Sequence, residues 1–110
     1  MPELRAISPL YGPYFAWAST CAGLPIKPAS KPHEIRAAGT PPILVVGTTR
    51  DPATPYKWAQ GLANQLEAGV LLTYDGDGHG AYTNDTSWCV SKAVDAYLIE
   101  GTVPAKGTTC

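Results

Sequence analysis

Residues 43–82 read ILVVGTTRDPATPYKWAQGLANQLEAGVLLTYDGDGHGAY, and this stretch decides the fold. It contains two short apolar runs, at about 43–48 and 70–75, on either side of an amphipathic segment at about 55–68. Apolar, β-branched side chains on both faces of the first run favour a strand that is covered from both sides. A strand, a helix and a second strand in so short a span predict a right-handed βαβ unit with parallel strands.

The segment at about 55–68 has the 3.6-residue period of a helix that packs on a sheet. We expect its inner face, with Trp58 as part of the core, to be formed by Trp58, Ala59, Leu62, Ala63 and Leu66. Thr54 is a suitable N-cap, Pro55 suits the first helical position, and Gly69 suits a left-handed stop.

A second helix is predicted at about 87–100, between the turn and cap residues 84–87 and Gly101. Its inward-facing residues are predicted to be Val90, Ala93, Val94, Tyr97 and Leu98. We expect Trp88 to pack this helix onto the sheet. The tail 102–110, TVPAKGTTC, is predicted to be irregular.

Residues 1–42 carry weaker signals. Residues 1–9 are expected to be an extended lead-in, followed by one short helix that brings Tyr14, Trp17, Ala18 and Cys21 to one face. A proline-rich irregular connection then runs to residue 42, and His33 within it is expected to be solvated. The sequence thus divides into a 1–42 segment and a 43–110 segment that together form a single incomplete domain.

Two parallel strands do not make a complete sheet, because each leaves one edge unpaired. Either residues 1–42 cover the gap, or the chain is the C-terminal βαβα portion of a larger α/β domain, which we favour. An isolated piece with exposed edges and faces is expected to self-associate as a homo-oligomer.

The composition narrows the class of protein. With 110 residues, 45% hydrophobic and 15% charged, the chain has the composition of one small globular domain. The net charge of −1 and the scattered Lys and Arg residues argue against nucleic-acid binding. No apolar stretch reaches the roughly 20 residues of a membrane span, and the N-terminus lacks the pattern of a signal peptide.

Three cysteines make an odd number. A disulfide from Cys89 to Cys110 would close a loop of about 20 residues around the last helix, worth about 3 kcal/mol in the chain-entropy model. We favour this pairing because a terminal Cys is hard to explain by core packing. Cys21 is then either free or paired with a segment outside this chain. Paired cysteines are typical of an oxidising compartment outside the cytoplasm.

Asp51 and His79 are the candidate functional pair. Each follows one of the two predicted strands, and the carboxyl ends of adjacent parallel strands lie about 5 Å apart. A carboxylate that accepts from one imidazole nitrogen orients the ring and leaves the other nitrogen to act as a base. Glycines on both sides of His79 allow the sharp turn that such an arrangement needs.

Other interpretations of these residues compete with this one. Asp51 could simply be a turn aspartate before a helix, and His79 a polar loop residue. The alternation of Asp75, Asp77 and His79 supplies too few ligands for a calcium-type site, so we expect no metal. Arg50 could bind a carboxylate such as a peptide terminus, although a surface ion pair is the simpler expectation, and Tyr82 is a candidate for lining a pocket near His79.

The order strand, Asp, helix, strand, His, helix resembles the final third of an α/β-hydrolase, in which the nucleophile Ser precedes the Asp and the His. The motifs GTTRDPATPY, GDGHGAY and SWCVSKAVDAYLIEGTVPAKGTTC, with CAGLP upstream, are similar to the C-terminal domain of tripeptidyl-aminopeptidase-like secreted actinobacterial serine peptidases. The resemblance implies that Asp51 is the triad acid, that His79 is the general base and that Cys89–Cys110 is a structural disulfide.

The chain lacks the nucleophile of that family. None of its five serines, Ser8, Ser19, Ser30, Ser87 and Ser91, lies in a G-x-S-x-G motif. We therefore expect this chain to be inactive alone and to supply two triad residues to a secreted or envelope-associated exopeptidase that needs no cofactor and acts on peptides. The alternatives are a stand-alone extracellular binding module and a piece of an esterase or lipase of the same fold.

Overall fold

A computed structural model describes residues 2–13, 25–26, 29–83 and 86–110. The chain forms two compact units, residues 1–33 and 34–110. The second unit holds β1 (Ile43–Arg50), α2 (Tyr56–Gln65), β2 (Gly69–Asp77) and α3 (Trp88–Glu100). Its βαβα order confirms the predicted α/β class, with β1 two residues and β2 three residues longer than the predicted 43–48 and 70–75. The predicted division into 1–42 and 43–110 stays a prediction.

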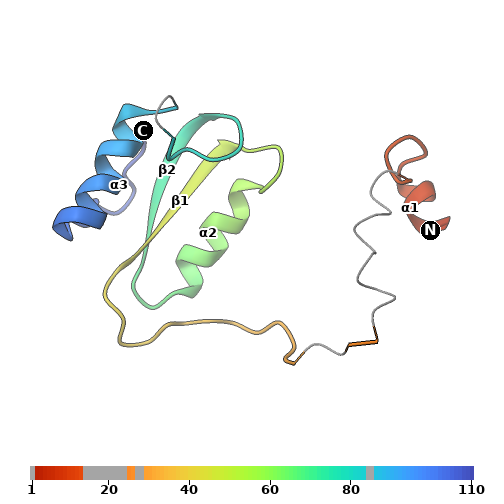
Figure 1. The fold of residues 1–110 in the computed structure, drawn as a ribbon, viewed down its shortest axis with the longest axis horizontal. Helices are drawn as coiled ribbons and strands as arrows, with labels where there is room; N and C mark the ends of the chain where they lie inside the picture. Colours follow the sequence, from red (N-terminus) through yellow and green to blue (C-terminus); the bar gives the residue numbers. More distant parts are fainter. Residues whose placement is uncertain (1, 14–24, 27–28, 84–85) are drawn as a thin grey trace. The chain divides into compact units, whose positions relative to one another are not determined.

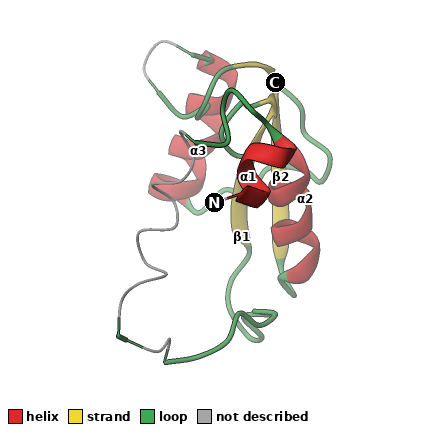
Figure 2. Ribbon diagram, turned by 90° about the vertical axis from the view of Figure 1, so that its right-hand side faces the viewer, coloured by secondary structure: helices red, strands yellow, loops and turns green. Residues whose placement is uncertain are grey.

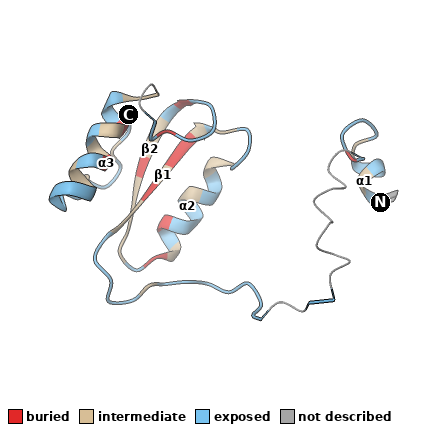
Figure 3. Cartoon of the chain, in the orientation of Figure 1, coloured by how far each residue is buried: buried red, intermediate tan, exposed pale blue. Residues whose placement is uncertain are grey.

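The strands β1 and β2 pair in parallel, from Ile43 opposite Gly69 to Thr48 opposite Tyr74. Helices α2 and α3 lie on opposite faces of this pair (Figures 1 and 2). Because side chains alternate along a strand, Val45 faces α2, whereas Val46 and Leu72 face α3. The expectation that β1 is covered on both sides is therefore confirmed, and the buried residues gather on the strands and on the facing sides of the helices (Figure 3).

The face of α2 that packs on the sheet is rotated relative to the predicted one. Ala59, Ala63 and Leu66 pack against the sheet as expected, but Trp58 is 58% exposed and Leu62 is 45% exposed. The helix lies very close to β1, where a Cβ on Gly47 would come within 2.7 Å of the Ala59 Cβ. This close approach seats small side chains against the strand and leaves the bulkier Trp58 on the flank, so the expectation of a core Trp58 is wrong.

Helix α2 is also shorter than the predicted 55–68. Pro55 is its N-cap and makes no side-chain capping bond, Leu66 is its C-cap, and Gly69 already belongs to β2. The hydroxyl of Thr54 does not cap the helix because it donates to Asp51 instead.

Helix α3 matches its predicted ends. The Ser87 side chain accepts from the Val90 N–H, and Gly101 closes the helix in the left-handed conformation at φ 71°. Val90 and Val94 are buried, as expected. Trp88 and Leu98, which were expected to face inward, are 78% and 65% exposed, because the narrow two-stranded layer is filled by the two valines.

The C-terminal tail covers the outer edge of β2, so the predicted irregular tail is partly ordered by pairing. Thr73 donates its N–H to the Thr108 carbonyl and accepts from the Cys110 N–H, and Asp75 donates to the Cys110 carbonyl. The disulfide Cys89–Cys110 fastens this tail to the first turn of α3. Among the described residues, β1 has a strand partner on one edge only.

In the first unit, residues 2–7 form the short helix α1 (Pro2–Ile7) rather than the expected extended lead-in. Glu3, Leu4, Arg5 and Ala6 are good helix formers, and Glu3 in the first turn complements the helix dipole. The short helix expected to carry Tyr14, Trp17, Ala18 and Cys21 lies outside the described residues. His33 is exposed, as predicted, with Nδ1 at 3.1 Å from the Lys31 carbonyl.

We expect loss of the disulfide to release the tail from β2. The double variant Cys89→Ser, Cys110→Ser should lose about 3 kcal/mol of unfolding free energy, because the bridge spans 21 residues. Denaturant unfolding measures the loss, and hydrogen exchange should show faster exchange at the Asp75 and Cys110 amides. Reduced wild-type protein should behave like the variant, and a reductant that leaves the wild type unchanged would contradict the prediction.

Candidate functional site

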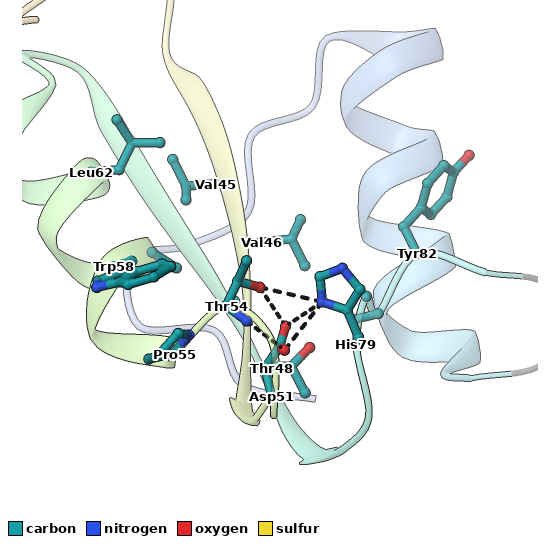
Figure 4. Close-up of a pocket in the computed structure, with 14 residues that line it drawn as sticks. Val45, Val46, Thr48, Asp51, Thr54, Pro55, Trp58, Leu62, His79 and Tyr82 are labelled. Atoms are coloured by element: carbon teal, nitrogen blue, oxygen red, sulfur yellow. Dashed lines mark hydrogen bonds and ion pairs between the residues drawn. The ribbon is translucent and has the colours of Figure 1, made fainter. Parts of the chain in front are cut away.

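The carboxyl ends of β1 and β2 bring Asp51 and His79 together across 28 residues of sequence. His79 Nδ1 lies 3.0 Å from Asp51 Oδ2 and 3.1 Å from Oδ1 (Figure 4). The expectation that the two side chains meet is confirmed. Gly78 and Gly80, at φ 109° and 87°, supply the sharp turn that presents the ring.

Asp51 is held by the turn that follows it. Its Oδ1 accepts the N–H groups of Ala53 (2.8 Å) and Thr54 (2.9 Å), and its Oδ2 accepts the Thr54 hydroxyl (2.7 Å). The side chain is only 6% exposed. Asp51 is therefore both a turn residue and the partner of His79, because the turn that donates to the carboxylate also directs it toward His79.

These donors keep Asp51 ionised. The Thr54 N–H and then the Thr54 hydroxyl, with smaller contributions from the Ala53 N–H and His79, hold the pKa of Asp51 far below its ordinary value. An ionised carboxylate can only accept, so the proton between the two side chains belongs to His79 Nδ1. Thr54 Oγ1 lies 3.4 Å from the same nitrogen.

His79 is exposed on its other side. Its side chain is 62% accessible, and no described residue hydrogen-bonds its Nε2. In Figure 4, Nε2 lies on the edge of the ring that faces away from Asp51. With Nδ1 protonated, Nε2 carries the lone pair, so the arrangement can take a proton from a group placed beside it.

A cavity of about 470 Å³ lies beside this pair. Asp51, Thr54 and His79 line one part of it, and the exposed flank of α2 contributes Trp58 and Leu62 (Figure 4). The site thus combines one polar corner with an apolar wall, an arrangement common in small-molecule and peptide sites.

Tyr82 lines the same cavity, but its hydroxyl points away from the Asp51–His79 contact (Figure 4). The hydroxyl donates to Asp95 Oδ1 at 2.7 Å, and this hydrogen bond raises the pKa of Tyr82. Only the ring of Tyr82 is therefore placed to touch a ligand, and its role in binding stays a prediction.

The acidic residues of the DGDGH stretch have separate partners. Asp75 and Asp77 form ion pairs with Arg50, whereas His79 contacts Asp51. The surface ion pair expected for Arg50 is confirmed. Within the described ranges, no three His, Cys, Asp or Glu side chains cluster in a way that could hold a metal ion.

Sequence reasoning missed two contributors to the site. Thr54 was assigned to the helix cap, although the spacing of Asp and Thr three residues apart is a known side-chain-to-backbone turn pattern that could have revealed it. The link from Arg50 to both Asp75 and Asp77 had no such local signal, because it spans 25 and 27 residues.

The chain is similar to a known protein family over most of its length. The model of the family described as TAP-like protein matches residues 8–110. The chain belongs to this α/β-hydrolase family. The family match includes both strands and both Asp51 and His79.

Three curated relatives carry different names. Serine protease Hip1 of Mycobacterium tuberculosis is 47% identical over 96% of this chain. Carboxylesterase B of M. tuberculosis is 40% identical over 98%, and tripeptidyl aminopeptidase of Streptomyces lividans is 32% identical over 89%. The chain spans only 21%, 21% and 19% of these relatives, respectively.

We expect Asp51 to make the free energy of unfolding depend on pH in the acidic range. Because folding lowers its pKa, the carboxylate stabilises the folded state at neutral pH, and this contribution is lost as the pH falls below about 4. Asp51→Asn should therefore be less stable than the wild type at neutral pH, with a gap that shrinks as the pH falls. Denaturant unfolding followed by circular dichroism from about pH 7 to about pH 3 measures this gap.

Two threonine variants serve as graded and control cases for this prediction. Thr54→Val removes one donor to Asp51 and should give an intermediate pH dependence, whereas Thr40→Val removes a hydroxyl that, among the described residues, bonds only to the Ala37 carbonyl. The Thr40 variant should keep the pH dependence of the wild type. A gap between wild type and Asp51→Asn that is constant over the pH range would contradict the prediction.

Proposed function

We propose that this chain supplies the acid and the base of a Ser-His-Asp triad in a serine hydrolase. One observation carries the proposal: a nearly buried, ionised Asp51 contacts His79 Nδ1, and Nε2 remains open on the other side of the ring. In such a triad the Asp orients the imidazole and stabilises the imidazolium, and Nε2 takes the proton of the nucleophile. This contact distance favours a hydrolase over a stand-alone binding module, for which the pair would be incidental.

The nucleophile of the proposed triad comes from outside this chain. No G-x-S-x-G motif occurs in its 110 residues, and the curated relatives are about five times longer. The partner of this chain is thus a segment that carries the serine and the oxyanion donors of the same protein. In the part of the chain that the structure describes, the exposed flank of α2 and the second edge of β1 are open to such a segment.

The substrate class that we propose is a peptide with a free N-terminus, cleaved by acyl transfer through the serine. Two of the three relatives described above carry names of peptidases, and the third carries the name of a carboxylesterase. Ester cleavage is the second candidate for this reason. The chemistry of the acid and the base is the same in both, so the choice depends on the rest of the site.

We further propose that the protein works outside the cytoplasm, in the envelope or the extracellular space. The Cys89–Cys110 disulfide supports this location, because such bridges persist in oxidising compartments. No helix among the described residues combines the length and the apolar character of a membrane span. Self-association of the isolated chain stays a prediction.

The isolated chain should show no hydrolase turnover. Because triad residues act as a unit, His79 without a nucleophile gives no acyl-enzyme. A fluorophosphonate probe should leave the 110-residue chain unlabelled, while it labels a full-length protein that contains this sequence. Stoichiometric labelling of the isolated chain that is lost in His79→Ala would overturn the proposed division of labour.

In the full-length protein, Asp51→Asn should lower kcat by roughly 10⁴-fold, because the imidazole then loses its orienting carboxylate. KM for a tripeptide amide should change little, since Asp51 contacts His79 and not the substrate. Glu100→Gln, at the exposed end of α3, is a matched amide control and should keep the wild-type rate. A comparable kcat for Asp51→Asn and Glu100→Gln would falsify the role of Asp51.

A further inference from the structure

Arg50 joins the ends of the two strands that carry the proposed acid and base. It precedes Asp51 directly, and its guanidinium spans two carboxylates of β2. Nε donates to Asp77 Oδ1 and Nη1 donates to Asp75 Oδ1, both at 2.8 Å. The Thr49 hydroxyl also donates to Asp75 Oδ1, at 2.9 Å.

The strand pairing shifts by one residue at this place. Thr48 lies opposite Tyr74, but Arg50 lies opposite Asp77, so β2 contains one more residue than β1 over this interval. Such bulges are uncommon in parallel pairs. Gly76 lies inside the bulge, where a Cβ would come within 2.1 Å of the Tyr74 ring.

The bulge moves His79 toward Asp51. In an unshifted ladder Arg50 would lie opposite Gly76, three residues before His79, whereas it lies opposite Asp77, two residues before it. One residue of strand is about 3.3 Å. That displacement is comparable to the 3.0 Å between Asp51 Oδ2 and His79 Nδ1, so the register at the end of β2 affects how closely the two side chains approach.

The contacts of Arg50 lie on both sides of the bulge. Asp75 comes just before Gly76 and Asp77 just after it, and only a forked side chain with several donors can hold both at once. The three side chains are 53%, 62% and 83% exposed, in the order Arg50, Asp75 and Asp77. Exposed ion pairs contribute little to the free energy of unfolding, so the main effect of these contacts is on the position of the β2 backbone around the bulge.

We infer that Arg50 is a positioning residue, which clamps the bulge in β2 and thereby sets the geometry between Asp51 and His79. This inference rests on the proposed function of that pair. Among the described residues, no hydrogen bond or ion pair joins Arg50 to His79, so Arg50 acts through the backbone that leads from Asp77 to His79 and through its own neighbour Asp51.

The tautomer of the neutral His79 ring reports this geometry directly. A carboxylate at Nδ1 favours the Nδ1–H tautomer, and long-range proton–nitrogen spectra measure the tautomer ratio at a pH about two units above the ordinary histidine pKa. The only other histidine, His33, is exposed and serves as an internal reference. The measurement uses the 110-residue chain and needs no enzymatic activity.

Arg50→Met should lower the ratio of Nδ1–H to Nε2–H tautomer at His79 by about fivefold, the factor that corresponds to the loss of one ordinary hydrogen bond. A lysine can reach only one carboxylate at a time, so the tautomer ratio in Arg50→Lys should lie between those of the wild type and of Arg50→Met. Arg36→Met is the matched control, since Arg36 lies exposed before β1, and it should keep the wild-type ratio. Asp77→Asn is a milder second variant that removes half of the clamp and should move the ratio in the same direction.

The outcomes separate this inference from the proposed function. If the tautomer ratio falls in Asp51→Asn but keeps its wild-type value in Arg50→Met and in Asp77→Asn, the positioning role alone is overturned. If the tautomer ratio is the same in Asp51→Asn as in the wild type, the proposed Asp51–His79 pair is overturned and this inference with it. Ratios that fall in the Arg50 and Asp77 variants, but not in the control, support the clamp.

Discussion

The parallel pairing of β1 with β2 is the constraint on which the rest of the structure depends. Parallel strands need a crossover, and α2 provides it while covering one face of the pair. Because both strands run in the same direction, their carboxyl ends lie at the same end of the sheet, where Asp51 and His79 meet. An antiparallel arrangement of the same two segments would place these residues at opposite ends of the sheet.

Asp51 satisfies two demands with one carboxylate. The turn after β1 needs an acceptor for the N–H groups of Ala53 and Thr54, and His79 needs an acceptor for its Nδ1 proton. Because the turn holds the carboxylate in place and keeps it ionised, little reorganisation is needed when the imidazole gains charge. The rigidity of the proposed acid is therefore a local property, whereas the position of the proposed base depends on the bulged end of β2, on the turn at Gly78 and Gly80, and on the clamp that we propose for Arg50.

The outer edge of β2 is protected, whereas the apolar flank of α2 beside the site is not. The outer edge of β2 is paired with the tail, and the Cys89–Cys110 disulfide secures that tail to α3. On α2, large apolar groups such as Trp58 remain exposed beside the site cavity. The open His79 nitrogen thus lies beside unburied apolar side chains of α2, which agrees with the proposal that a further segment completes the site there.

The sequence by itself determined the βαβα order, both ends of α3, the Cys89–Cys110 pair and the meeting of Asp51 with His79. These features follow from short-range signals: apolar runs, cap residues, glycines beside His79, and the rule that parallel strands share their carboxyl edge. Tertiary structure decided which sides of the helices face the sheet. The narrow two-stranded layer accepts Ala59 and Ala63 at close range and leaves Trp58, Trp88 and Leu98 exposed, and a periodic pattern does not reveal how wide the covered face is. It also decided the tail pairing on β2 and the bulge held by Arg50, because both depend on contacts between residues far apart in the chain.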